Sequence, residues 1–205
     1  MSDWKSTANY WDDRYAKKQT GWERDEAHPA LRNWIASGEL KPCSIAIPGC
    51  GRGHEALLLA ESGFDVTAID FAEEALRKST ERLRGFESSS SVVQGDVLSY
   101  RPTIQFDAVY EQTCMCAIAP AARLQYQESL YEWLRPEAKL FALFMQTRND
   151  SGVPPFHCDI EDMKMLFPVE RWEWQSKPIE HFEHPSGVGN ELAVILKRKG
   201  GTHVG

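Results

Sequence analysis

The chain has 205 residues, of which 42% are hydrophobic, and a formal net charge of −7 at pH 7. This length can bury one core, so we expect a single domain over residues 1–199, followed by a disordered tail at 200–205. An acidic chain without a long apolar run is not typical of a nucleic-acid-binding or membrane-spanning protein. We therefore expect a cytoplasmic protein without nucleic-acid or membrane partners.

The cysteines and histidines carry no metal signature. Five cysteines without framework spacing are typical of free thiols in a reducing compartment. Cys114 and Cys116 form a C-x-C pair but lack a second pair at zinc-like spacing, so we interpret them as small buried residues. His181 and His184 are followed at once by Pro185, which indicates a loop rather than a ligand-bearing helix. We assign no metal.

The first 40 residues are rich in aromatic side chains. The sequence predicts a helix over 7–18 and a second helix after His28 and Pro29. These aromatic residues either pack an N-terminal helix onto the core or form a lid over a cationic ligand. They are Trp4, Tyr10, Trp11, Tyr15, Trp22 and Trp34.

A cofactor-binding unit follows. A buried strand is expected over 44–48, and glycines follow it at positions 49, 51 and 53. A helix over 53–62 and a second strand over 65–69 come next, with Asp70 at the tip of that strand. Glycines at such a turn let a ligand approach the backbone closely. An acidic residue after the second strand can accept hydrogen bonds from both hydroxyls of a ribose. The unit therefore predicts an adenosine-containing cofactor.

Two cofactor classes compete for this unit. Dinucleotide sites use G-x-G-x-x-G, but here the sixth position is His54. The G-x-G-x-G pattern with Asp70 favours S-adenosylmethionine, which has no pyrophosphate and leaves S-adenosylhomocysteine as product. Hydride transfer with a nicotinamide cofactor stays as the less favoured alternative.

The rest of the chain alternates strands and helices. We expect helices over 72–84, 120–134 and 159–166, and strands over 91–94, 106–110, 138–145, 170–175 and 191–197. Alternation of this kind predicts an α/β fold with a mainly parallel sheet of seven strands and helices on both faces. The last two strands lack a crossover helix between them, which indicates an antiparallel hairpin at the sheet edge.

Taken together, four segments resemble the thiopurine S-methyltransferase family, including its halide/thiol methyltransferase branch. The resemblance covers nearly the whole chain. The segments are Tyr10-Trp11-x3-Tyr15 with Thr20-Gly21-Trp22-Glu23 and Pro29, the loop from Ile47 to Glu55, the segment from Phe106 to Ala117, and Gly152-Val153-Pro154-Pro155-Phe156.

The resemblance implies a Rossmann-like class I methyltransferase fold, with residues 1–40 as an aromatic N-terminal lid. It also implies a cofactor site made of Trp11, Tyr15, Trp22, Gly49, Gly51, Asp70, Asp96, Val97 and Gln112. Asp70 would hold the ribose, and Asp96 and Val97 would face the adenine. Asp96 could instead only cap a turn, and Gln112 could be a strand-end residue without a special role.

Two positions depart from the halide/thiol branch. Relatives often carry tryptophan at the position of Tyr15, so the lid contact can differ. They also tend to carry tyrosine where this chain has Phe156, the residue expected at the substrate mouth. The missing hydroxyl removes a polar contact for a small anion, which disfavours a halide acceptor.

The expected reaction is transfer of a methyl group from S-adenosylmethionine to a small-molecule nucleophile, most simply a thiol or a sulfide-like anion. A thiolate needs no strong base, so we assign no catalytic residue. Glu111 could act as a base or could be structural. The alternatives are a halide, thiocyanate, nitrogen or oxygen acceptor, or a non-catalytic module that only binds S-adenosylmethionine. We expect a monomer.

Overall fold

The computed structural model describes residues 7–149, 151–187 and 189–200. Within these residues eight strands form one sheet, in the order β3-β2-β1-β4-β5-β8-β6, and β7 also pairs with β8. The strands are β1 (Ser44–Pro48), β2 (Asp65–Asp70), β3 (Ser90–Gln94), β4 (Phe106–Gln112), β5 (Leu134–Thr147), β6 (Trp172–Trp174), β7 (Glu180–Glu183) and β8 (Gly189–Arg198). Trp4 and residues 201–205 of the expected tail lie outside the described residues.

The first five strands are parallel, and β8 pairs antiparallel with β5, β6 and β7. The antiparallel pair of β6 and β8 was predicted. The prediction of seven strands missed β7, which pairs with β8 beside β6. Its four residues are mostly exposed and polar, so they lack the alternating apolar pattern that marks a strand.

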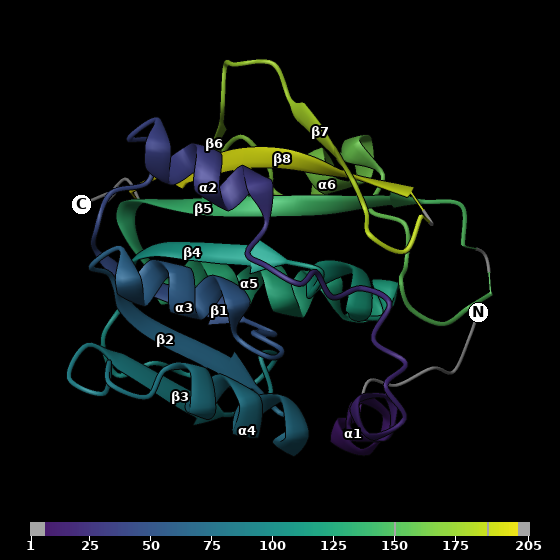
Figure 1. The fold of residues 1–205 in the computed structure, drawn as a ribbon. Coiled ribbons are helices and arrows are strands. Elements are labelled where there is room, and N and C mark those ends of the chain that lie inside the picture. The colour runs from purple at the N-terminus through teal and green to yellow at the C-terminus, as the bar shows by residue number, and fades with distance from the viewer. Residues whose placement is uncertain (1–6, 150, 188, 201–205) are drawn as a thin grey trace.

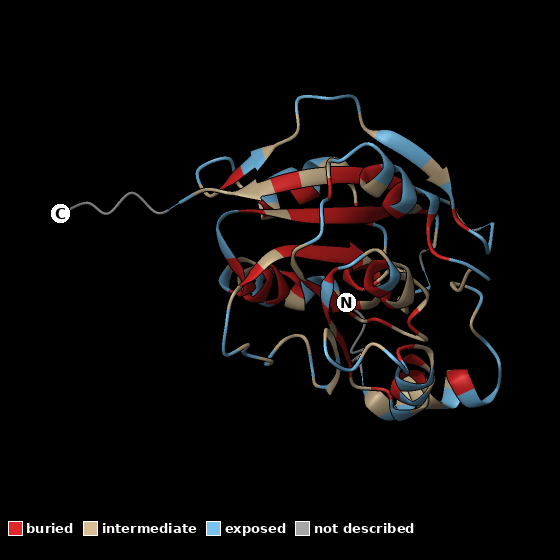
Figure 2. Ribbon diagram, turned by 60° about the vertical axis from the view of Figure 1, so that its left-hand side comes forward, coloured by how far each residue is buried: buried red, intermediate tan, exposed pale blue. Residues whose placement is uncertain are grey.

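Helices cover both faces of the sheet (Figure 1). Helices α2 (Pro29–Ala36), α3 (His54–Glu61) and α4 (Glu73–Arg82) lie in front, whereas α5 (Arg123–Trp133) and α6 (Ile160–Leu166) lie behind. Ile45 and Ile47 of β1 pack with the α2 and α3 side, whereas Ala46 packs with the α5 side. This alternation buries the central strands on both faces, and they are red along much of their length in Figure 2.

Helix α1 (Ala8–Ala16) stands apart from these layers and packs against α4. Thr7 caps it through its side-chain oxygen, and the Glu74 amide donates a hydrogen bond to Asp12 Oδ1 at 3.1 Å. The arrows of β2 and β4 in Figure 1 point toward the side of the molecule where α1 lies. In open α/β sheets ligands bind outside these carboxyl ends, so α1 covers the expected ligand edge.

None of the helices in the described part of the chain is long and apolar enough to cross a membrane.

Candidate active site

A cavity of about 510 Å³ lies between the carboxyl ends of the parallel strands and helix α1. Its wall includes Gly49 after β1, Asp70 at the end of β2 and Thr113 after β4. A smaller cavity of about 60 Å³ adjoins it beside the glycine loop and shares Tyr15, Trp22, Gly49 and Thr113 with it. We call these the large and the small cavity.

The glycine loop brings backbone to the wall of both cavities. Gly49 and Gly51 have φ angles of 61° and 53°, a region that side chains with a Cβ rarely adopt. A Cβ on Gly51 would lie 3.0 Å from the Tyr15 hydroxyl, and one on Gly49 would lie 3.1 Å from Cys114 Sγ. Gly49 lines both cavities and Gly51 the small one. A larger residue at either position would therefore displace a neighbouring side chain of the cavity wall.

Asp70 joins the glycine loop to the second strand. Its Oδ2 accepts the amide of Gly51 and its Oδ1 accepts the amide of Ala72, both at 3.0 Å. Burial raises the pKa of Asp70 above its usual value, although the backbone hydrogen bonds oppose this shift. Each carboxylate oxygen has a further lone pair, so the side chain can still accept two hydroxyl groups from a ligand in the large cavity.

Asp96 and Val97 lie in the turn after β3 and line the large cavity. Asp96 Oδ1 accepts the amide of Leu98 at 2.9 Å, and its carbonyl oxygen accepts the amide of Tyr100 at 2.7 Å. Asp96 therefore caps a turn and also borders the cavity, so the two sequence-based interpretations are compatible.

The lid aromatics meet over the cavity. Trp22 packs edge-on against Trp11 and Tyr15, with ring centroids 5.3 Å and 5.8 Å apart, and all three line the large cavity. Burial raises the pKa of Tyr15 well above its usual value, and the nearby charges of Asp70 and Glu23 add to this shift. Trp34 instead packs in the core against Tyr110 and Phe141. Trp34 is thus a core residue, whereas Trp11, Tyr15 and Trp22 border the cavity.

Gln112 lies at the end of β4 and lines the small cavity. Its Oε1 accepts the Tyr110 hydroxyl at 2.7 Å, which fixes the orientation of the amide. Glu23 lines the same cavity and pairs with Arg52 at 2.8 Å, while its other carboxylate oxygen is buried without a hydrogen-bond partner. The small cavity is therefore more polar than the large one.

Phe156 is not among the described residues that line the two cavities. Its amide donates to the carbonyl oxygen of Cys116 at 2.7 Å, and the preceding Pro154 and Pro155 line the large cavity instead. Phe156, which was predicted at the substrate mouth, is therefore next to wall residues in the chain but is not one of them.

Several wall residues of the large cavity were not among the predicted site residues, although Thr113 and Cys116 lie in the segment that resembles the family. Thr113 is a β-branched residue with a φ angle of 57°, which is a rare and strained conformation. Because strain of this kind depends on the surrounding fold, no local pattern reveals it. The other wall residues missed by the sequence analysis include Cys116, Met145, His184 and Ser186.

Glu111 does not reach the cavities. It is fully buried, its Oε1 accepts the amide of Met115 at 2.6 Å, and it lies outside the walls formed by the described residues. Burial raises its pKa to about 7. The hydrogen bond holds the short helix η1 (Met115–Ala117) against the end of β4, so the role of Glu111 is structural.

The arrangement suits a ligand with a ribose, a flat base and a positive charge. The wall of the large cavity includes Asp70, the turn at Asp96 and Val97, and the aromatic rings of the N-terminal segment. Gly49 and Gly51 leave room beside the polar small cavity, where an amino-acid moiety can be held. S-adenosylmethionine has these three parts, so the residues fit it.

A family model described as thiopurine S-methyltransferase matches residues 6–189. Thiocyanate methyltransferase 1 of Arabidopsis thaliana is 29% identical over 162 residues, covering 78% of this chain and 71% of that protein. Probable thiol methyltransferase 2 of the same plant is 25% identical over 193 residues, covering 93% of this chain and 80% of that protein.

A similar solved structure is the 1,6-didemethyltoxoflavin-N1-methyltransferase of Burkholderia thailandensis with bound 1,6-didemethyltoxoflavin and S-adenosylhomocysteine. It superposes with a TM-score of 0.81 at 16% identity and covers 98% of this chain and 94% of that chain. This likeness confirms the predicted class I methyltransferase fold.

Proposed function

The chain belongs to the thiopurine S-methyltransferase family, and on this premise we propose that its methyl acceptor is a small thiol or a sulfide-like anion. It is an enzyme that transfers a methyl group from S-adenosylmethionine to a small molecule. The proposal concerns the acceptor and the residues that hold donor and acceptor. The observation that supports it is the large cavity, whose wall brings together Asp70, Gly49 of the glycine loop and the aromatic residues Trp11, Tyr15 and Trp22.

We propose that the predicted cofactor residues hold the donor. Asp70 binds the ribose hydroxyls, and Asp96 and Val97 border the adenine. Trp11, Tyr15 and Trp22 cover the sulfonium, where a cation–π contact contributes about 0.5–2 kcal/mol. The methionine end extends along Gly49, Gly51 and Gln112 toward the small cavity.

The lid also supports the chemistry. S-adenosylmethionine supplies an activated methyl group. A thiolate attacks the methyl carbon in line with the breaking carbon–sulfur bond, whose electron pair stays on the departing thioether. The protein contributes by holding the nucleophile about 3–3.5 Å from the methyl carbon and by excluding water that would solvate the anion. No side chain needs to form a covalent bond.

The acceptor end of the large cavity is mainly apolar. Cys116, Met145, Pro154 and Pro155 line it, and we place Phe156 behind this wall as support for Pro155. Such a wall favours an apolar thiol over a strongly hydrated halide, because the halide would lose its hydration shell without gaining polar contacts.

Thiocyanate is the second candidate acceptor. Arg14 of α1 lines the large cavity with its guanidinium 4.8 Å from the Tyr10 ring, so a small anion would find one positive charge in the wall. One of the plant relatives is a thiocyanate methyltransferase, which supports this alternative.

Methyl transfer from methyl-labelled S-adenosylmethionine to single acceptors tests the proposal. The panel contains hydrosulfide, alkyl and aryl thiols, a thiopurine, thiocyanate, iodide, and an amine and a phenol. We expect labelled thioether as the main product. Label that appears only on nitrogen, oxygen or halide would refute the proposed acceptor class.

We further propose that the chain acts as a cytoplasmic monomer, with residues 1–199 as one domain and without nucleic-acid or membrane partners. The free cysteines and the net charge of −7 support this. Sedimentation at the mass of one chain, 23.3 kDa, is the expected result, and a stable dimer would contradict it.

A further inference from the structure

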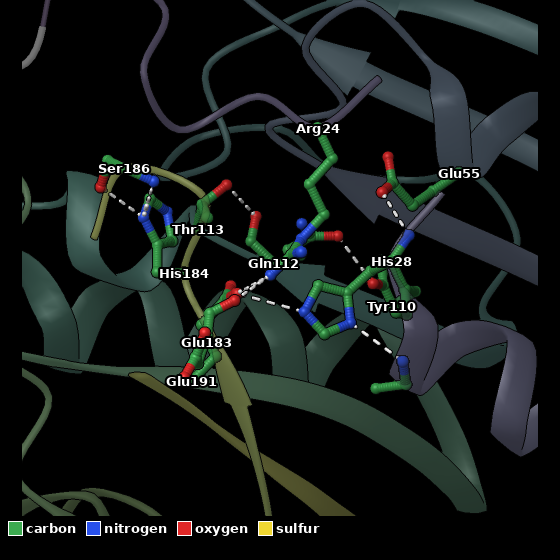
Figure 3. Close-up of polar contacts among 11 residues, drawn as sticks. Arg24, His28, Glu55, Tyr110, Gln112, Thr113, Glu183, His184, Ser186 and Glu191 are labelled. Atoms are coloured by element: carbon green, nitrogen blue, oxygen red, sulfur yellow. Dashed lines mark hydrogen bonds and ion pairs between the residues drawn. The ribbon is translucent and has the colours of Figure 1, made fainter. Parts of the chain in front are cut away.

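A buried charge cluster links the chain segment after the lid helix to the last strand. Glu191 of β8 has a side chain only 1% exposed, and its Oε2 accepts hydrogen bonds from Arg24 Nη2 and His28 Nε2, each at 3.1 Å (Figure 3). His28 Nδ1 accepts the amide of Ala30 at 3.0 Å, so the ring proton lies on Nε2 and points to Glu191. We call Arg24, His28 and Glu191 the charge cluster.

The same segment, residues 17–28 between α1 and α2, touches the β7–β8 hairpin at three further places. Arg24 Nη2 donates to the Glu183 carbonyl oxygen at 2.5 Å. The His28 ring packs edge-on against Phe182 with centroids 5.1 Å apart. Gly21 lies next to Ser186, since a Cβ added to Gly21 would be 3.8 Å from the Ser186 Cβ. We call residues 17–28 the lid linker.

These contacts join two sides of one opening. Gly21 and Trp22 of the lid linker line the large cavity, and so do His184 and Ser186 of the β7–β8 turn. The turn is held by hydrogen bonds of its own. His184 Nδ1 pairs with Ser186 Oγ at 2.6 Å, and the Gly187 amide donates to the His184 carbonyl oxygen at 2.9 Å. The rim of the cavity therefore consists of two segments far apart in the sequence.

The charge cluster favours one arrangement of this rim. Burial by itself raises the pKa of Glu191, but the hydrogen bonds from His28 and Arg24 oppose burial, and the pKa lies below its usual value. A buried ion pair adds little net stability compared with apolar packing, yet it is costly to separate. Such a pair is therefore suited to fixing relative position, here that of the lid linker and the hairpin.

We propose that Glu191 is a positioning residue for the methyl acceptor. Through Arg24 and His28 it fixes the distance between the lid linker and the β7–β8 turn, and thereby the width of the acceptor end of the large cavity. Glu191 is not among the described wall residues of either cavity, so it acts without touching donor or acceptor. The inference rests on the proposed function, because it assigns this rim to the thiol acceptor.

Glu191→Gln tests this role, since it keeps the side-chain shape but removes the charge that attracts Arg24. We expect the KM for the preferred thiol to rise about tenfold. The affinity for S-adenosylhomocysteine in calorimetry should stay within about twofold, and kcat should change little. Glu128→Gln is the matched control: Glu128 pairs with Arg171 on the outer face of α5, away from both cavities, and its loss should leave the thiol KM unchanged.

Hydrogen exchange gives a readout that does not depend on turnover. The His184 amide donates to the Gly189 carbonyl oxygen at 3.0 Å, and Gly187 donates within the turn. Both amides should exchange faster in Glu191→Gln and at the wild-type rate in Glu128→Gln. Phe182→Leu removes the ring that packs against His28 and keeps the charges, so it should produce a smaller increase in the exchange rates of the same two amides. This variant replaces Glu191→Gln in the test if Glu191→Gln does not fold.

An unchanged thiol KM together with unchanged exchange at His184 and Gly187 would overturn the positioning role. Equal losses of donor and acceptor binding would overturn it too, because they indicate general destabilisation. A wild-type protein that methylates no thiol would instead refute the proposed function, and the exchange experiment would still report whether Glu191 holds the turn.

Discussion

Asp70 shows how one side chain can organise the proposed donor site. Its carboxylate receives amides from the glycine loop and from the start of the following turn, and it faces the large cavity. Burial raises the pKa of Asp70, so placing a charged carboxylate at this position lowers the free energy of unfolding. A residue held in this way is suited to binding hydroxyl groups with little rearrangement.

Asp70→Asn should weaken S-adenosylhomocysteine binding by about 10- to 100-fold, because hydrogen bonds to a charged group contribute about 1.5–3 kcal/mol. Titration calorimetry measures the change. Asp65→Asn, at the exposed start of the same strand, is the control and should bind like the wild type. Equal affinity of the Asp70 variant and the wild type would remove Asp70 from the donor site.

Glu111 should make stability depend on pH. The folded protein keeps its proton up to about pH 7, whereas the unfolded chain loses it near pH 4.5. The free energy of unfolding therefore falls as the pH rises through this window, by an amount on the order of 3 kcal/mol from this residue.

In Glu111→Gln this contribution disappears. The stability difference between variant and wild type, from denaturant unfolding at about pH 5 and about pH 8, should shift in favour of the variant at the higher pH. A difference that is the same at both pH values would show that Glu111 titrates normally.

Helix α1 and the lid linker form an element with two attachments. Helix α1 packs against α4, and the linker is tied to the core by Glu23 with Arg52 and by the charge cluster. Trp22 stands between these attachments and contacts both Trp11 and Tyr15. We therefore expect Trp22 to contribute most to covering the proposed donor site.

Trp22→Ala should raise the KM for S-adenosylmethionine about tenfold and lower kcat, because the cavity loses an aromatic face and admits water. Trp22→Phe keeps a ring there and should recover most of the loss. Steady-state kinetics at saturating thiol measure both effects. Wild-type kinetics in the alanine variant would mean that the lid does not cover the donor.

Local patterns predicted most of the secondary structure. The strand over 44–48 was predicted with its observed bounds, because its apolar run ends at a glycine turn. Strand β5 begins at Leu134, whereas the sequence predicted a start at residue 138. Pairing with β4 extends the strand through a segment that contains Pro136, and the register of this pairing shifts between Phe106 and Ala108. Strand β7 was missed because only pairing with β8 makes it a strand.

Across the fold, the donor and acceptor ends of the cavity differ in how far the sequence reveals them. The proposed donor end comes from consecutive strand ends, so Gly49 and Asp70 follow from a local motif, whereas Asp96 was expected only from the family resemblance. The proposed acceptor end is assembled from η1, the end of β5, the segment of Pro154 and Pro155, and the β7–β8 turn. His184 and Ser186 reach it only through the long-range pairing of β8 with β5, which no short motif encodes.

The most direct test of the account is a competition experiment with the wild-type protein. An alkyl thiol, thiocyanate and an amine are supplied together at equal concentration with methyl-labelled S-adenosylmethionine, and the labelled products are separated and counted. We predict that the thioether carries most of the label, because the acceptor end is apolar and a thiolate needs no base. Label that accumulates mainly on thiocyanate or on nitrogen would contradict the assignment of this chain as a thiol methyltransferase.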